Sequence, residues 1–239
     1  MHQTSRVPGP SLRAVVPFGL GDPGKVMRRL LTPRQQRTLA ALATRINAEP
    51  RQILYREGAP AGSIFICGDG ALKAFRDLPS GKRRILAFMF ADDAFGLAEN
   101  GRYVNTVQAL KKTTCYRIAI EALVPVLQQD AELQWHFLCK ITHELRESQR
   151  RALAVGRRSA TGRFAMFLKM LERRTQESPK NSISLPMSRS EIADYLGLSL
   201  ESVSRATAQL VREQVIEFRG AHEVRVIDRP KLEKLASNL

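Results

Sequence analysis

The sequence predicts an α+β protein in which a β-sandwich or barrel precedes a long helix and a helix-turn-helix with a wing. Three observations predict this order. Short runs of β-branched and aromatic residues alternate with glycine turns between residues 51 and 123. A heptad pattern follows over residues 130–155. Two short helical patterns then meet at Gly197.

The chain is basic, with 38 Lys and Arg against 23 Asp and Glu and a formal net charge of +15. Such a charge favours a polyanionic partner such as nucleic acid. Residues 1–120 carry a net charge of +11 and residues 121–239 only +4, so charge by itself supports DNA binding at the C-terminal end weakly. No apolar run approaches 18 residues and the N-terminus lacks a signal-peptide pattern. We therefore expect a cytoplasmic protein that does not enter membranes.

The N-terminal region changes character near residue 29. Residues 1–28 contain four prolines and little periodicity, and we expect a loosely attached arm there. Thr32 followed by Pro33 is typical of a helix start, and the apolar spacing predicts that this helix continues to about Asn47.

Residues 51–123 carry the strand signals. Gly, Pro and Asp clusters separate six short segments with strand composition, which indicates an all-β sandwich or barrel. The expected strands are Gln52–Tyr55, Ser63–Cys67, Leu72–Arg76, Arg84–Phe90, Thr106–Leu110 and Thr114–Ile118.

A long helix is expected from about Asp130 to Val155, ending near Gly156. Along it, residues spaced by three and four form a heptad seam. The seam consists of Leu138, Ile141, Leu145, Ser148, Ala152 and Val155. With no obvious partner elsewhere in the chain, it predicts a homodimer; the alternative is that the seam packs on the chain's own β domain.

The C-terminal region predicts a winged helix. A helix over 159–174 and a short strand over 183–185 precede the helix-turn-helix. Val215–Phe218 and Glu223–Ile227 flank a Gly-Ala-His turn and predict a hairpin, the wing. A final helix is expected over 231–239.

The helix-turn-helix occupies residues 188–206. Ile192, Ala193 and Leu196 repeat at helical spacing and stop at Gly197, which can adopt the positive φ of a tight turn. Ser199 then caps a second helix. That helix buries Val203, Ala206 and Leu210. An ordinary helical hairpin with a solvated face is the alternative interpretation.

The opposite face of the second helix carries side chains suited to the DNA major groove. Arg205 can donate two hydrogen bonds to guanine O6 and N7, and Glu201 can accept from cytosine N4. Ser204 lies beside them, and Leu200 can contact a thymine methyl. Arg189, Ser190, Ser199 and Ser202 lie near helix N-termini and are candidate phosphate contacts.

No pattern indicates catalysis or a bound metal. Nucleophile–base pairs, carboxylate dyads and phosphate-binding loops are missing, so we do not expect an enzyme. Cys67, Cys115 and Cys139 are far apart in sequence and form no metal-binding motif, so no metal or other cofactor is expected. We interpret them as small buried residues; a redox role for Cys139 across the dimer is the alternative.

The order of these elements resembles the Crp/Fnr superfamily of bacterial transcription regulators over about residues 30–239. Three features carry the resemblance: the hairpin Ile66-Cys67-Gly68-Asp69-Gly70-Ala71-Leu72, the long helix, and the stretch Ser190–Arg205 with the E-x-x-S-R pattern of the Fnr and FixK branches. The resemblance implies an N-terminal arm (1–28), a cyclic-nucleotide-binding-like β-jelly-roll (29–125), a dimerisation helix (126–158) and a winged helix-turn-helix (159–239). It also implies an activator that contacts RNA polymerase and reads a palindrome resembling TTGA-N6-TCAA.

The departures from this family concern its effectors. Cyclic-nucleotide-binding members carry a Gly-Glu-Leu segment and, about ten residues later, an Arg that holds the phosphate. In this chain Phe95-Gly96-Leu97-Ala98-Glu99 stands at the first place, with the Glu displaced. Val104-Asn105-Thr106 stands at the second place and contains no Arg, and Arg102 lies two or three positions too early to replace it. Residues 1–50 contain no cysteine for an iron–sulfur cluster. We therefore expect DNA binding without a small-molecule effector. A jelly roll that binds an unidentified small molecule, or haem through His2, His136, His143 or His222, is the alternative.

Overall fold

The computed structural model describes residues 13–15, 28–98, 100–157, 159–174 and 182–237. Packing divides the chain into a first unit, residues 1–76 and 88–146, and a second unit, residues 77–87 and 147–239. The described part of the arm consists of β1 (Arg13–Val15), which pairs with β2 (Arg28–Leu30). The rest of the expected arm lies outside the described residues.

Helix α1 (Pro33–Leu42) begins where the sequence predicts but ends earlier. Thr32 accepts a hydrogen bond from the Gln35 amide, and the Gln35 side chain accepts one from the Thr32 amide, a capping box followed by a proline. The expected continuation to Asn47 is wrong. Residues 43–48 form strand β3 (Ala43–Ala48), because they pair along their whole length with a strand 70 residues later.

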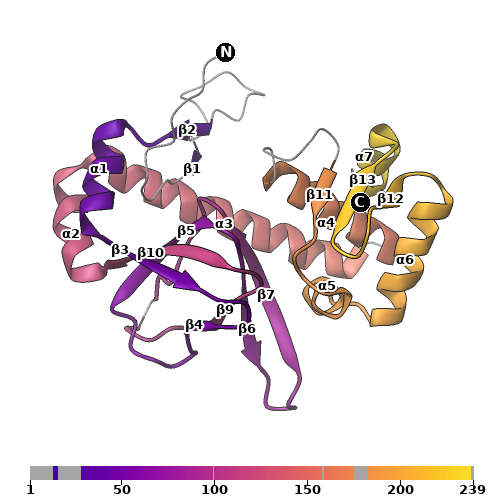
Figure 1. The fold of residues 1–239 in the computed structure, drawn as a ribbon, viewed down its shortest axis with the longest axis horizontal. Coiled ribbons are helices and arrows are strands. Elements are labelled where there is room, and N and C mark those ends of the chain that lie inside the picture. Colours follow the sequence, from indigo (N-terminus) through magenta and orange to yellow (C-terminus); the bar gives the residue numbers. More distant parts are fainter. Residues whose placement is uncertain (1–12, 16–27, 99, 158, 175–181, 238–239) are drawn as a thin grey trace. The chain divides into compact units, whose positions relative to one another are not determined.

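The β domain contains two four-stranded sheets, as expected for a jelly roll (Figure 1). One has the order β3-β10-β5-β8 and the other the order β4-β9-β6-β7. Their remaining strands are β4 (Ile53–Tyr55), β5 (Ser63–Asp69), β6 (Ala71–Asp77), β7 (Arg83–Phe90), β8 (Ala94–Phe95), β9 (Thr106–Ala109) and β10 (Thr113–Ala119). All six expected strands are present; β3 and β8 were not expected.

Two helices follow β10. Helix α2 (Ile120–Gln129), which was not expected, precedes α3 (Ala131–Arg157), which continues through Gly156 rather than ending there. The two are separated by Asp130, whose carboxylate accepts hydrogen bonds from the Leu133 amide at 2.8 Å and from the Gln35 side chain. The start of α3 is thereby fixed to α1.

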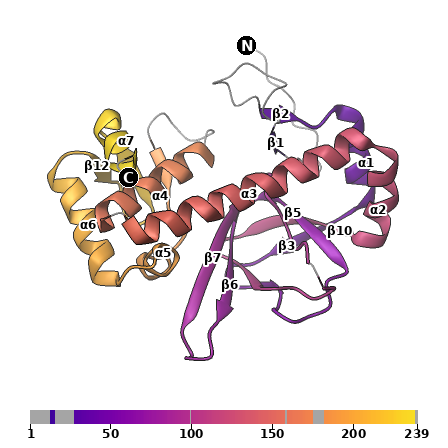
Figure 2. The ribbon, with the colours of Figure 1, turned by 180° about the vertical axis from the view of Figure 1, so that it is seen from behind.

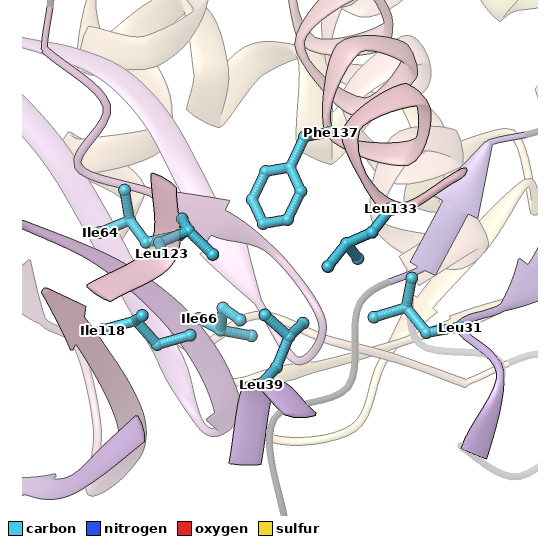
Figure 3. Close-up of a cluster of buried hydrophobic side chains, with 8 residues drawn as sticks. All are labelled: Leu31, Leu39, Ile64, Ile66, Ile118, Leu123, Leu133 and Phe137. Atoms are coloured by element: carbon cyan, nitrogen blue, oxygen red, sulfur yellow. The ribbon is translucent and has the colours of Figure 1, made fainter. Parts of the chain in front are cut away.

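One face of α3 closes a hydrophobic cluster of the first unit. Leu133 and Phe137 point from α3 toward side chains of α1 and the β3-β10-β5-β8 sheet (Figure 3). All members of the cluster are buried, and seven of the eight are at most 3% exposed. They are Leu31, Leu39, Ile64, Ile66, Ile118, Leu123, Leu133 and Phe137.

The second unit has the expected order of a winged helix. It contains α4 (Ala160–Arg174), β11 (Ser182–Ser184), α5 (Arg189–Leu196), α6 (Leu200–Arg212), β12 (Ile216–Phe218), β13 (Glu223–Val226) and α7 (Arg229–Ser237). The strands form one antiparallel sheet in the order β11-β13-β12. Figure 2 shows this unit from behind, with α5 and α6 meeting at their turn.

Candidate nucleic-acid interface

The turn between α5 and α6 forms as the sequence predicts. Ser188 and Glu191 make a capping box at the start of α5, and Gly197 ends the helix at φ 64° and ψ 41°. The Ser199 hydroxyl then accepts a hydrogen bond from the Ser202 amide at 3.1 Å and starts α6. Local hydrogen bonds thus define the starts of α5 and α6, and a glycine in the left-handed region defines the end of α5.

Helix α6 buries one face and exposes the other. Val203, Ala206 and Leu210 are at most 2% exposed. On the outer face, the side chains of Glu201 and Arg205 are 75% and 71% exposed. Their Oε1 and Nη1 atoms lie 3.4 Å apart, an ion pair between successive turns. The structure therefore brings the two expected base-reading groups together on one accessible surface.

The other two expected base readers differ in exposure. Leu200 is 51% exposed at the first position of α6. Ser204 is half-buried, so its hydroxyl is less available than the neighbouring charged groups. A base contact from Leu200 or Ser204 remains a prediction.

The four expected phosphate contacts fall into two groups. Ser190 and Arg189 are exposed in the first turn of α5, and the Arg189 guanidinium lies 5.5 Å from the centre of the Phe218 ring on β12. Ser199 and Ser202 instead bond to each other, with 2.9 Å between their hydroxyl oxygens. Contact of Ser199 and Ser202 with DNA remains a prediction. Whether or not they contact DNA, Ser199 has a structural role, because its hydroxyl caps the N-terminus of α6.

Sequence reasoning missed Arg163, which holds the turn in place. Its Nη1 donates to the carbonyl oxygens of Leu196 and Gly197, each at 3.3 Å. These are carbonyl groups at the C-terminal end of α5, where a cation is favourable. Nearby, the Thr161 hydroxyl donates to the Gln209 side chain at 2.7 Å. Both contacts join α4 to the helix-turn-helix, and no local pattern in the sequence signals them.

The expected wing is the β12–β13 hairpin, closed by a hydrogen bond of 2.9 Å from the Arg219 amide to the Glu223 carbonyl. Arg219 and Arg225 are exposed on it. The sequence predicted the hairpin but no contact residue on it. These arginines add positive charge beside α6 in the same unit.

The heptad seam of α3 is exposed wherever its side chains are described. Leu138, Ile141 and Leu145 are 50%, 48% and 57% exposed, and Ser148 and Ala152 are exposed as well. The Val155 side chain lies outside the described residues. Leu138, Ile141 and Leu145 belong to the same unit as the β domain, and their exposure shows that they do not pack on it, which removes that alternative for these three positions. Trp135 and Leu153, not expected in the seam, are also exposed.

Arg102 and Tyr103 contact other parts of the β domain. Arg102 is exposed and donates one hydrogen bond, from Nη1 to the Gly58 carbonyl at 2.7 Å. Tyr103 stacks on Tyr55 with 3.8 Å between ring centres and donates a hydrogen bond to the Ser63 carbonyl. Phe65 and Phe95 stack beside them. Burial raises the pKa of Tyr55, so its phenol stays neutral.

Two of the three cysteines are buried as expected, whereas Cys139 on α3 is only half-buried. Cys67 and Cys115 face each other on β5 and β10, and both are fully buried. A hydrogen bond with Cys115, together with burial, raises the pKa of Cys67, and burial raises that of Cys139. Because the thiolate is the reactive form, these thiols are poor nucleophiles. Among the described residues, no cluster of three His, Cys, Asp or Glu side chains is placed to hold a metal ion.

The histidines named for haem binding are dispersed. His136 is buried on α3 in the first unit. His222 belongs to the second unit, where its Nδ1 atom lies 3.0 Å from the Leu185 carbonyl oxygen of the same unit. His2 and the His143 side chain lie outside the described residues. Within the part of the chain that is described, no helix is both long and apolar enough to cross a membrane.

Comparison with known proteins matches both halves of the chain. A Crp-like helix-turn-helix model matches residues 162–235, and a cyclic nucleotide-binding domain model matches residues 45–130. The chain is 30% identical over 209 residues to the transcriptional activatory protein AadR of Rhodopseudomonas palustris, covering 87% of each chain. It is 30% identical over 207 residues to the nitrogen fixation regulation protein FixK of Azorhizobium caulinodans, covering 85% of this chain and 84% of that one.

Among solved structures, FixK2 from Bradyrhizobium japonicum is similar with a TM-score of 0.77 and 30% sequence identity. The match covers 82% of this chain and 98% of that chain. The expected jelly roll, long helix and winged helix-turn-helix are therefore confirmed together as one fold, and the expected resemblance is confirmed along most of the chain.

Proposed function

Because the chain belongs to the Crp/Fnr family of DNA-binding transcription regulators, within its FixK-like branch, we propose that it acts as a homodimer on a palindrome resembling TTGA-N6-TCAA. One observation carries the proposal. Glu201 and Arg205 lie within 3.4 Å of each other on the exposed face of a helix with the E-x-x-S-R pattern. One side chain accepts and the other donates, which suits cytosine and guanine in the major groove.

The exposed seam on α3 supports the dimer. Large apolar side chains spaced along one helix face are costly to leave in water, and a second copy offers the same stripe. Two recognition helices related by a two-fold axis would read half-sites about one helical turn apart. The buried opposite face of α3 anchors the seam to the jelly roll.

The jelly-roll sequence supports DNA binding without a small-molecule effector, because Val104-Asn105-Thr106 lacks the Arg that would hold a cyclic phosphate. Arg102, which stands too early in the sequence, donates from Nη1 to the Gly58 carbonyl. The matched relatives are called activators or regulation proteins, which favours activation here, with RNA polymerase as a further partner.

Two measurements test the proposal. Selection of bound sites from random duplex DNA should return a palindrome with TTGA half-sites, and sedimentation of the complex should give two chains per site. Purified protein should bind that operator equally well with and without cyclic AMP. A requirement for cyclic AMP, haem or any other added ligand would favour an effector-gated regulator instead, and non-palindromic selected sites would refute the dimeric mode.

A further inference from the structure

The first turn of α4 is packed into the second unit and aims one long side chain at the helix-turn-helix. A local cap fixes this turn, because the Ser159 hydroxyl accepts a hydrogen bond from the Gly162 amide at 3.1 Å. Thr161 and Phe164 are 9% and 1% exposed, so the turn is buried in its own unit. Arg163 lies between them, is half-buried, and reaches the turn between α5 and α6. The start of α4 is therefore a fixed base from which Arg163 can act on that turn.

Arg163 supplies hydrogen bonds to the carbonyl side of the α5–α6 turn. The amide groups of the turn donate back to α5, among them the Leu198 amide to the Ala193 carbonyl at 2.9 Å. The carbonyls of Leu196 and Gly197 accept from Nη1 of Arg163, each at 3.3 Å. The last carbonyls of a helix have no partner within it and carry partial negative charge, so a guanidinium both bonds them and suits their charge. One cation from α4 thus ties down the turn.

The position of this turn sets where the reading face of α6 begins. Glu201 and Arg205 follow Gly197 closely and lie in the first half of α6. The second half of α6 has its own link to α4, because the Thr161 hydroxyl donates to the Gln209 side chain at 2.7 Å. The turn held by Arg163 is the corresponding link at the end of α6 that carries the base-reading groups.

We propose that Arg163 is a positioning residue for base reading: by fixing the α5–α6 turn, it holds Glu201 and Arg205 where both reach the edges of their bases. A displacement of roughly 0.5 Å is enough to weaken hydrogen bonds to base edges. Attraction to the phosphate backbone does not depend on such exact placement. Loss of Arg163 therefore lowers sequence discrimination more than general affinity for DNA. The inference rests on the proposed function, because it takes Glu201 and Arg205 as base readers.

Arg163→Met in the full-length protein separates this role from a phosphate contact made by Arg163 itself. Fluorescence anisotropy over a salt series gives the affinities for operator and scrambled DNA. The ratio of the two affinities should fall about tenfold, while the affinity for scrambled DNA stays within about twofold of wild type and its salt dependence is unchanged. A phosphate contact would instead weaken both DNAs alike and reduce the salt slope by about one.

Two further variants complete the test. Arg219→Met removes the same charge from the exposed wing, and as the matched control it should weaken operator and scrambled DNA by the same factor. Arg163→Lys keeps the charge but loses the forked donor, so the affinity ratio should fall only about threefold. Should Arg163→Met fail to fold, Arg163→Lys carries the test, and a ratio equal to that of wild type would then overturn the proposal.

Hydrogen exchange in the absence of DNA tests the hold on the turn directly. In Arg163→Met the Leu198 amide should exchange roughly threefold faster or more, while the Leu210 amide within α6 exchanges as in wild type. An unchanged affinity ratio, or equal weakening on both DNAs, would overturn Arg163 as a positioning residue. If the Leu198 amide exchanges faster but the wild-type protein discriminates no operator, the proposed function fails and the hold of Arg163 on the turn stands.

Discussion

Replacing Arg205 with alanine should remove sequence discrimination without unfolding the protein. The side chain is 71% exposed, and the only contact described for it is the 3.4 Å ion pair with Glu201. An exposed pair of this kind contributes at most about 0.5 kcal/mol to folding. The thermal unfolding midpoint of Arg205→Ala should therefore stay close to that of wild type.

The effect on DNA is expected to be far larger. A bidentate arginine–guanine contact discriminates by about 1–3 kcal/mol, and a two-fold dimer has two such contacts, about 2–6 kcal/mol in total. At about 1.4 kcal/mol per factor of ten, the ratio of operator to scrambled-site affinity should fall roughly 30-fold to 20,000-fold. Loss of Glu201 pairing adds little, because that carboxylate is solvated in either protein.

Fluorescence anisotropy at fixed salt measures both affinities. Lys234→Ala is a matched control, since it removes one exposed positive charge from α7 of the same unit. Lys234→Ala should lower the affinity for operator and for scrambled DNA by the same factor, because it removes only electrostatic attraction to the phosphate backbone, which does not depend on sequence. Arg205→Ala that still discriminates as wild type does would refute the assignment of Arg205 as a base reader.

Three further changes test other parts of the structure. Ile141→Glu should place a charge in the proposed dimer seam and give a monomer by analytical ultracentrifugation, with an unchanged far-ultraviolet spectrum; a dimer at micromolar concentration would contradict the seam. Leu39→Ala, at a fully buried position, should lower the free energy of unfolding in urea by about 2–5 kcal/mol, and a loss below about 1 kcal/mol would mean that the cluster repacks. Cys67 and Cys115 should react with a thiol reagent at pH 8 only as fast as the protein unfolds, because both side chains are fully buried and the reagent cannot reach them in the folded protein; rapid labelling of the native protein would show otherwise.

The helix boundaries predicted best are those set by local chemistry. Thr32 with Pro33, Gly197 and Ser199 each start or end a helix through a bond or dihedral angle confined to a few residues. Such signals survive in any tertiary context, so the sequence alone is enough to place them.

The elements that were missed depend on distant partners. Ala43 and Ile46 continue the helical spacing of α1, yet they lie in β3 because β10 offers a full set of backbone hydrogen bonds. Helix α2 contains Pro125 and several β-branched residues, which favour a strand or loop over a helix. The contact of Arg163 with the turn spans more than 30 residues and has no sequence signature.

The exposed face of α6 was largely predictable because its periodicity is strong. Burial of Val203, Ala206 and Leu210 fixes the rotation of the helix and so leaves Glu201 and Arg205 outside. The polar link between α4 and α6 was not predictable. Thr161 and Gln209 lie 48 residues apart, and a hydrogen bond between such side chains depends on packing that no periodicity encodes.

The pairing of β3 with β10 has a consequence for how the protein is made. Synthesis proceeds from the N-terminus, and β3 has β10 as its one neighbour among the described strands, so it can pair only after residue 119 has been added. Until β10 has left the ribosome, the backbone of β3 is unpaired and the apolar side of α1 is exposed to solvent. Truncated nascent chains that stop short of residue 119 should therefore be sensitive to protease and bind holding chaperones, and full protection should come only in chains from which residue 137 has also emerged, because Leu133 and Phe137 complete the cluster.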